Sequence, residues 1–258
     1  MSSDAPVLTE SANGIHTITF NRPEKKNAFT LAMYSAIVAS MRAAKKDPKV
    51  RVLVLQGKDG VFTAGNDLID FAQNPPKSSD TPVFEFLTEI ASYPKPVIAG
   101  VAGPAVGIGV TMLMHCDLVY AAEDAKFVMP FVNLGLVPEG ASTFWLPRLA
   151  GRAKASELLM FGDPFGAKVA EEIGLVNEIV EPSALAGLVR DRAAQLAAKP
   201  AASLRLTKRL IRDALGGRVE AALEREGHEF IQRLTSPEAG EAFAAFMAKR
   251  KPDFSQFD

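Results

Sequence analysis

Residues 95–109 read KPVIAGVAGPAVGIG, and this stretch decides the fold. After Pro96, residues 97–101 form a continuous apolar run, which predicts a β-strand buried on both faces. Small residues follow, and a helix is predicted over about 107–115. A buried strand that passes through a glycine-rich turn into a helix is typical of layered α/β proteins, in which ligands gather at the carboxyl ends of the strands.

The sequence on either side alternates strands and helices. Residues 15–20 alternate apolar and polar side chains, and residues 50–55 form a second apolar run, so both are predicted strands. Between them, Thr30 can cap a helix whose apolar residues recur at helical spacing until Pro48 ends it. A further strand is predicted at 117–122. We therefore expect an α/β fold.

The sequence changes character in its second half. Beyond the strand-like residues 175–180, Ala, Leu, Arg and Glu dominate, and Pro and Gly separate helical segments. We place a boundary near residue 195: residues 1–195 form the core with the ligand site, and residues 196–258 form a helical region that contacts other subunits. Residues 69–81 are rich in Pro and Ser without periodicity, which predicts a surface loop beside the site.

Composition limits the possible classes of protein. The 258 residues carry 29 Lys+Arg and 30 Asp+Glu, and the formal net charge of −1 excludes a general polyanion binder. Cys116 is the sole cysteine, so an internal disulfide and a cysteine-based zinc cluster are excluded. The N-terminal residues lack a signal-type pattern, and glycines interrupt the most apolar stretch. We expect a cytoplasmic protein without a membrane segment.

Two glycine-containing turns form the candidate site. FTAGNDL at 62–68 follows the strand at 50–55, and AGPAVGIG at 102–109 follows the strand at 97–101. Both turns should lie at the same edge of the sheet. The second leaves unpaired backbone amides at a helix start, which stabilise negative charge on a ligand oxygen. Tight chain packing explains either turn alone, whereas the pair favours an oxyanion site.

Other ligand classes lack their motifs. The glycines at 103, 107 and 109 are spaced GxxxGxG, unlike the GxGxxG of dinucleotide-binding proteins, and no GxxxxGK[ST] phosphate loop is present. His16, His115 and His228 lie in unrelated segments, so no metal site is predicted. A GxSxG nucleophile elbow is also missing.

As a set, several motifs resemble the enoyl-CoA hydratase/isomerase (crotonase) superfamily across nearly the whole chain. They are NRP at 21–23, NA at 27–28, FTAGNDL at 62–68, KPVIAGVAGPAVGIG at 95–109, CDLVYAAEDAKF at 116–127 and GLVNEIV at 174–180. The resemblance implies a spiral of repeated ββα units with a C-terminal helical region. It also implies an acyl-CoA thioester substrate and assembly as a homotrimer or hexamer.

The resemblance assigns roles to particular residues. It implies that the backbone amides of Asn66 and Ile108 form the oxyanion hole for the thioester carbonyl. CoA, which enters as part of the substrate without any metal or redox cofactor, would contact Lys26, Ala28, Ala64, Asp67 and Leu68. From the residues themselves, Asp67 is better suited to holding its loop through hydrogen bonds to the backbone than to contacting CoA. Lys25 and Lys26 equally suit a solvated charge pair.

The reaction depends on carboxylates. Hydratases of this family use two glutamates, and the corresponding positions here are Thr111 and Phe131, which cannot exchange protons near neutral pH. Residues 130–142, PFVNLGLVPEGAS, instead resemble the PFxxLGxxPEGxSS-type segment of the Δ3,Δ2-enoyl-CoA isomerases, whose catalytic acid corresponds to Glu139. Apolar neighbours would raise the pKa of Glu139 and a following helix start would lower it, so the sequence leaves its pKa open.

We therefore expect a Δ3,Δ2-enoyl-CoA isomerase in which Glu139 alone moves a proton from C2 to C4. The alternatives are an enoyl-CoA hydratase and, from a different class, a non-catalytic protein of the same fold that binds CoA or RNA. The RNA alternative rests on a basic stripe at helical spacing, Arg205, Lys208, Arg209 and Arg212. The near-zero net charge disfavours it, so we expect no nucleic-acid partner.

Overall fold

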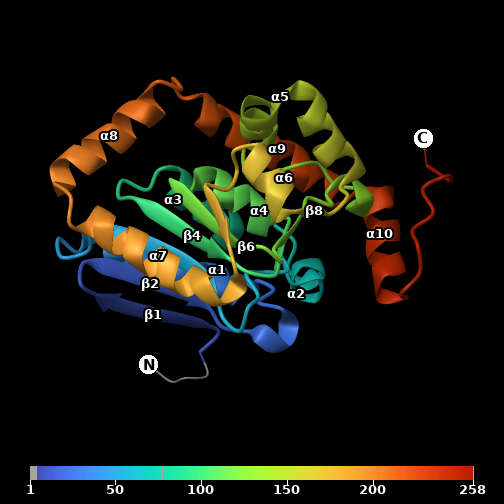
Figure 1. Cartoon of the computed structure of the whole chain (residues 1–258). Helices are drawn as coiled ribbons and strands as arrows, with labels where there is room; N and C mark the ends of the chain where they lie inside the picture. Colours follow the sequence, from blue (N-terminus) through green and yellow to red (C-terminus); the bar gives the residue numbers. More distant parts are fainter. Residues whose placement is uncertain (1–4, 77, 79, 258) are drawn as a thin grey trace.

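The computed structural model describes residues 5–76, 78 and 80–257, and a six-stranded sheet forms its centre (Figure 1). The strand order is β1-β2-β3-β4-β6-β9, in which β1 is antiparallel to β2 and all other neighbours are parallel. The four strands predicted up to residue 122 are confirmed with small shifts at their ends. The bounds are β1 (Val7–Ala12), β2 (Ile15–Phe20), β3 (Val52–Gly57), β4 (Val97–Val101), β6 (Leu118–Ala122) and β9 (Glu178–Val180).

A second, smaller sheet turns the chain into the expected spiral. It contains β5 (Pro104–Val106), β7 (Lys126–Val128) and β8 (Phe165–Gly166) in the order β5-β7-β8. After each of β3, β4 and β6 the chain adds a short piece to this second layer: Thr63, which bridges to Ala105, then β5, then β7. Repeated ββα units are therefore confirmed.

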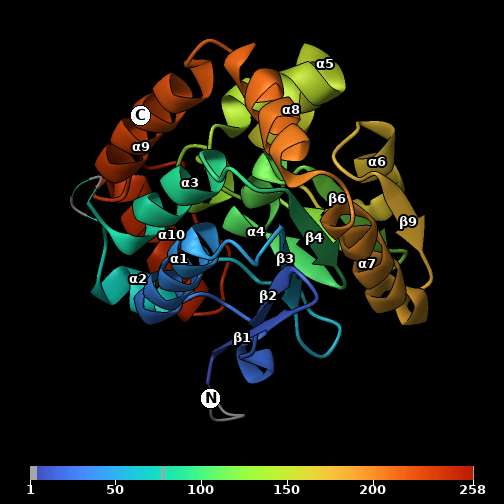
Figure 2. The same cartoon turned by 90° about the vertical axis from the view of Figure 1, so that its left-hand side faces the viewer.

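The strands of the large sheet are apolar because both of their faces are covered. In β3, Val52 and Val54 pack in the cluster under α7 (Pro182–Ala197), whereas Leu53 and Leu55 belong to the main core on the opposite face. Figure 2 shows α7 running along one side of the sheet. This two-sided burial explains why residues 50–55 read as a continuous apolar run rather than an alternating one.

Helices α1 (Leu31–Lys46) and α3 (Pro82–Ala91) pack against each other on the main-core side. The predicted cap of α1 is confirmed, since Thr30 Oγ1 accepts a hydrogen bond of 3.3 Å from Met33 N. At the other end, Lys95 Nζ donates to the carbonyl oxygens of Ala44 and Asp47 at 2.6 and 2.7 Å. A cation there satisfies unpaired carbonyls and complements the helix dipole.

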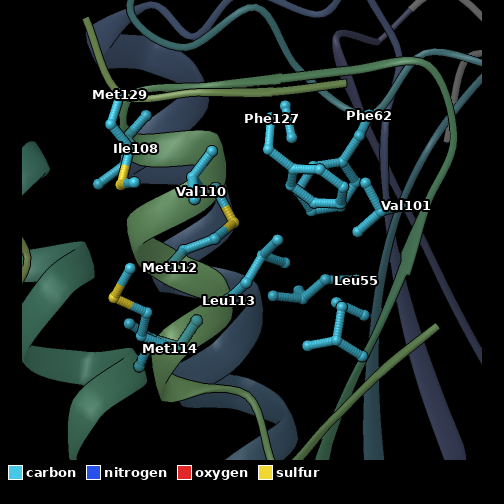
Figure 3. Close-up of a cluster of buried hydrophobic side chains, with 14 of the residues drawn as sticks. Leu55, Phe62, Val101, Ile108, Val110, Met112, Leu113, Met114, Phe127 and Met129 are labelled. Carbon is cyan, nitrogen blue, oxygen red and sulfur yellow. The ribbon is translucent and has the colours of Figure 1, made fainter. Parts of the chain in front are cut away.

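The glycine-rich turn leads into α4 (Ile108–Thr111), which continues as the 3₁₀ segment η2 (Met112–His115). Every residue of both pieces is buried. Figure 3 shows the apolar side chains of this segment packed among those of Leu55, Val101 and Phe127. The segment is therefore fixed in the core while its first residues lie at the strand ends.

The C-terminal region is helical, as predicted. Helix α8 (Ala201–Asp213) buries no residue and exposes Leu206, Leu210 and Ile211. Helix α9 (Arg218–Arg233) packs on α3 and α5 (Ser142–Phe161), and α10 (Pro237–Met247) packs on η3 (Val132–Leu134). The predicted boundary near residue 195 falls in the last turn of α7. None of the described helices is long and apolar enough to cross a membrane. The remaining bounds are η1 (Pro23–Lys25) and α6 (Ala167–Glu172), and α5 is interrupted at Gly151.

Residues 69–81 depart from the predicted loop. Helix α2 (Leu68–Gln73) occupies the start of this segment, and Asp67 Oδ1 caps it by accepting from Ile69 N and Asp70 N at 3.1 and 3.2 Å. Phe71 is buried against Phe230 of α9, with ring centroids 6.2 Å apart. The loop prediction was wrong here because that partner is distant in sequence; residues 77 and 79 lie outside the described residues.

Gly65 is the point at which the turn at 62–68 touches the second turn. It has φ +82°, and a Cβ there would lie 2.6 Å from the carbonyl oxygen of Val106, whereas Gly60, with φ +70°, faces open space.

We expect Gly60→Ala to lower the free energy of unfolding by about 1 kcal/mol, because alanine is strained in the left-handed backbone conformation. Gly65→Ala should cost about 1–3 kcal/mol more because the turns must separate. Urea unfolding measures both values, and equal costs would contradict the close approach.

Candidate active site

Asn27 ties the first turn to the NRP segment. This residue is fully buried, and its Nδ2 donates to Val61 O at 2.6 Å while its Oδ1 accepts from Arg22 N at 2.7 Å. Thr63 Oγ1 donates to Asn27 O at 2.7 Å and accepts from Gly65 N at 3.1 Å. Three of the motifs named above therefore form one hydrogen-bonded unit.

Asp67 holds this unit together. Its Oδ2 lies 2.6 Å from Arg22 Nη1, and its Oδ1 caps α2. Burial works in the opposite direction, but the hydrogen bonds from Arg22 and from the amides of Asp70 and Ile69 lower the pKa of Asp67 overall. The predicted loop-holding role is thus confirmed, and the contact of Asp67 with CoA stays a prediction.

One cavity of about 530 Å³ brings together most of the residues predicted for the site. Its apolar part is rich in phenylalanine, and Phe131 and Phe71 both meet Phe230 edge-on, at 6.5 and 6.2 Å. Lys25 also lines it. The predicted residues among the lining are Lys26, Ala28, Ala64, Asn66, Asp67, Leu68 and Ile108.

Asn66 and Ile108, the two residues predicted to form the oxyanion hole, both line this cavity. Gly65 N and Asp67 N, on either side of Asn66, donate to Thr63 Oγ1 and to Phe29 O. Among the described residues, neither Asn66 N nor Ile108 N donates a hydrogen bond. Ile108 N also lies at the first position of α4, where helix geometry leaves amides unpaired. The pair is therefore available to bind a ligand oxygen.

Glu139 is buried and only 5% exposed, in the loop between η3 and α5. Thr111 Oγ1 donates to Glu139 Oε1 at 2.6 Å, while Oε2 is buried without a hydrogen bond to any described residue. Burial raises the pKa of Glu139 to about 8; the Thr111 hydrogen bond opposes this increase, and the charge of Glu226 adds to it. Burial is the largest cause of the shift, and the helix that follows begins at Ser142, three residues further along the chain.

Glu139 does not line the cavity itself, but two side chains connect it to lining residues. Thr111 lies one helical turn after Ile108 in α4. Tyr34 Oη donates to Asn66 Oδ1 at 2.5 Å, and the pKa of Tyr34 is raised well above its usual range by burial and by the charge of Glu139. The sequence placed Tyr34 only on the buried face of a helix, because no local pattern marks this contact.

The remaining candidates have structural partners. In the basic stripe, Lys208 Nζ lies 2.6 Å from Asp117 Oδ2, and Arg212 Nη1 donates to Ser92 O at 3.0 Å. These bonds tie α8 to the residue before β6 and to the residue after α3, and such structural contacts are the ordinary explanation of a basic stripe. Burial raises the pKa of Cys116, so its thiol stays protonated at neutral pH.

The raised pKa of Glu139 has a consequence for stability. Between pH 4.5, its usual pKa, and about 8, the folded protein binds this proton more tightly than the unfolded chain, so the free energy of unfolding falls as the pH rises. Glu139→Gln lacks this dependence and should be more stable by roughly 2–4 kcal/mol at pH 8, with the gain shrinking toward pH 5. Urea unfolding at both pH values measures the difference. Parallel pH dependences for the two proteins would show that the carboxyl is not desolvated.

Known proteins that are similar to this chain belong to the enoyl-CoA hydratase/isomerase family. The family model for enoyl-CoA hydratase/isomerase matches residues 10–257. Over 260 residues, the chain is 35% identical to 1,2-epoxyphenylacetyl-CoA isomerase of Escherichia coli (strain K12), covering 96% of this chain and 98% of that protein. Enoyl-CoA delta isomerase 2 of Rattus norvegicus is 37% identical, with 95% of this chain but 64% of that protein covered.

A solved structure shares the whole architecture. Pseudomonas aeruginosa OdaA superimposes with a TM-score of 0.92 at 43% identity, over 94% of this chain and 98% of that chain. The spiral of ββα units, the two adjoining turns and the match over residues 10–257 all agree. The chain therefore belongs to the enoyl-CoA hydratase/isomerase (crotonase) family of enzymes.

Proposed function

We propose that this protein is a Δ3,Δ2-enoyl-CoA isomerase in which Glu139 alone carries the proton. The supporting observation is that the carboxyl of Glu139 is buried, with one oxygen bonded to Thr111 and the other without a hydrogen-bond partner among the described residues. Thr111 and Phe131 stand where hydratases of the family carry glutamates, so a second acid is missing from these positions. A carboxyl with a pKa of about 8 can both accept and return a proton near neutral pH.

The proposed reaction starts at the two free amides. The thioester carbonyl oxygen accepts hydrogen bonds from Asn66 N and Ile108 N, which stabilise the negative charge that develops on it. Glu139 removes a proton from C2, giving a dienolate, and then delivers that proton to C4, so the double bond moves from C3 to C2 and the carboxylate is regenerated. The acyl chain must therefore extend past Ile108 toward Thr111, on whose side Glu139 lies.

The cavity suggests how the rest of the substrate binds. We propose that CoA lies along Lys26, Ala28, Ala64 and Leu68, with the ammonium group of Lys26 near its phosphates, and that the phenylalanine-rich part holds an apolar acyl group. The reaction moves only a proton, so we propose no metal or redox cofactor. We also propose a cytoplasmic homotrimer or hexamer, in which the exposed apolar residues of α8 contact another subunit.

A second candidate is the isomerisation of an epoxide on an aromatic acyl-CoA. The phenylalanines of the cavity favour it, because aromatic rings pack edge-on against a bound ring. One of the relatives matched over nearly its full length is a 1,2-epoxyphenylacetyl-CoA isomerase. The same carboxyl and amides would serve, so the two candidates differ in the acyl group and not in the site.

Glu139→Gln should lower kcat for a 3-enoyl-CoA by about 10² to 10⁴-fold, because it removes the only proton carrier of the proposed reaction. KM should change little, since the cavity residues are retained. Glu89→Gln is the matched control: Glu89 is also buried, but its partners are Arg42 and Lys45 on α1. That variant should keep the wild-type turnover.

Product identification separates the possible reactions. The wild-type enzyme is incubated with matched 3-enoyl-CoA and 2-enoyl-CoA thioesters and with 1,2-epoxyphenylacetyl-CoA. Conversion of the 3-enoyl to the 2-enoyl thioester supports the proposal, and preferred turnover of the epoxide supports the second candidate. Formation of 3-hydroxyacyl-CoA as the main reaction, or full turnover by Glu139→Gln, would overturn the proposal.

A further inference from the structure

We infer that Thr111 and His115 are positioning residues that together hold Glu139, and that Thr111 fixes Oε1 so that Oε2 is the oxygen that carries the proton. The inference rests on the proposed function and deepens it. It assigns work to a residue that stands at the position of a hydratase glutamate but has no acid group of its own.

The two residues lie on one face of a continuous helical segment. Thr111 ends α4 and His115 ends η2, four positions later, so both side chains point to the same side. Thr111 Oγ1 donates to Glu139 Oε1 at 2.6 Å, and His115 Nε2 lies 2.8 Å from the carbonyl oxygen of Gly140, which accepts the ring proton. One helical segment therefore holds the carboxyl of Glu139 and the backbone carbonyl of the next residue, Gly140.

Both contacts are made in the protein interior. Thr111 has no exposed surface, and His115 is 9% exposed. Burial lowers the pKa of His115 to about 4, partly offset by the hydrogen bond to Gly140, so the ring is neutral at physiological pH and its single N–H is committed to that carbonyl. A neutral donor adds no charge beside Glu139, and the bond is present over the whole working pH range.

Gly140 makes the approach possible. It has φ +71°, and a Cβ at this position would lie 2.8 Å from Thr111 Oγ1. Any other residue would push the loop away from α4 and lengthen the bond to Glu139. The helix cannot follow such a movement, because its other side chains pack among Leu55, Val101 and Phe127 in the core (Figure 3).

The result is a carboxyl with two unequal oxygens. Oε1 is held by Thr111, whereas Oε2 is buried and has no hydrogen-bond partner among the described residues. A base that takes a proton from C2 and returns it to C4 must keep one oxygen directed at the substrate through both steps. Rotation of the carboxyl would exchange the oxygens, and the Thr111 hydrogen bond opposes that rotation.

The surrounding charges do not replace this bond. Glu226 of α9 raises the pKa of Glu139, and Tyr34 of α1 directs its hydroxyl to Asn66. Glu226 is a carboxyl and donates no hydrogen bond to Glu139; its Oε1 accepts from Thr143 N at 3.0 Å and from Thr143 Oγ1, and its Oε2 has no hydrogen-bond partner among the described residues. Among the described residues, Thr111 is thus the one hydrogen-bond donor to the Glu139 carboxyl, and its loss leaves the anion without any.

The test removes the hydroxyl at constant size. Thr111→Val keeps the shape of threonine and loses the donor, whereas Thr111→Ser keeps the donor. Thr111→Ala, compared with Thr111→Ser, repeats the comparison with a smaller side chain in case Thr111→Val does not fold. Ser142→Ala is the control, because Ser142 Oγ is buried in the same loop region but makes no hydrogen bond. The readouts are kcat, KM, thermal unfolding and the pH profile of kcat/KM, which reports groups of the free enzyme.

Loss of the donor should raise the pKa of Glu139 further, because a hydrogen bond to a carboxylate stabilises its charged form. The rise of kcat/KM with pH should then move upward by about one unit in Thr111→Val and Thr111→Ala, and kcat at pH 7.5 should fall about tenfold or more with KM within about twofold. Thr111→Ser and Ser142→Ala should keep the wild-type midpoint.

An unchanged midpoint and kcat in the hydroxyl-free variants, or a loss of thermal stability as their only effect, would overturn the inference. The inference would also be overturned if Thr111→Ser, which keeps the hydroxyl, had the same kcat and pH profile as Thr111→Ala. These results can be told apart from a failure of the proposed function. The proposed function fails only if Glu139→Gln retains turnover or if the main product is 3-hydroxyacyl-CoA. If Glu139→Gln is inactive while Thr111→Val is normal, only the positioning role is wrong.

Discussion

The parallel pairing of β3 with β4 is the constraint on which the site depends. Residues Leu53 to Gln56 pair in register with Val97 to Gly100, so both strands end at the same edge of the sheet. The chain leaves each strand through a turn, and Thr63 bridges to Ala105 between the two turns. Asn66 and Ile108 lie just beyond this bridge and line the same cavity, so two residues that are far apart in sequence come together only when the sheet is formed.

Burial of one carboxyl is the second constraint, and the fold accommodates it in an unusual way. A buried carboxylate is costly unless it is hydrogen-bonded, and Glu139 has one donor for two oxygens. Because burial is not compensated by enough hydrogen bonds, it raises the pKa of Glu139 to about 8, and the carboxyl stays mostly protonated below that pH. The surrounding core of α4, η2 and α5 provides the rigidity that keeps this under-satisfied group in place.

Much of the fold could be predicted from the sequence because its signals are local. The apolar run at 97–101, the cap Thr30 and the helical periodicity of the C-terminal region each depend on neighbouring residues only. The cavity residues were identified through motifs, which mark the loops but not their contacts. Helix α2 was missed because Phe71 is buried by Phe230, a partner that no window of sequence contains.

The same limit applies to the site. The sequence presented opposing effects on the pKa of Glu139, and the decision required its burial, which depends on α4, α9 and the loop before α5 together. The contact between Tyr34 and Asn66 and that between Thr111 and Glu139 join residues on different elements. Patterns of residue types indicate which groups a site contains, whereas distances between elements determine what those groups do.

Threonine at position 111 gives the carboxyl of Glu139 a hydrogen-bond donor in place of an acidic neighbour. A glutamate there would lie within hydrogen-bonding reach of Glu139, and two carboxyls at that distance share a proton and titrate as a pair. Threonine instead adds no charge and donates its hydroxyl hydrogen to Oε1, so the Glu139 carboxyl has no acidic partner at this position and one of its oxygens is held in place.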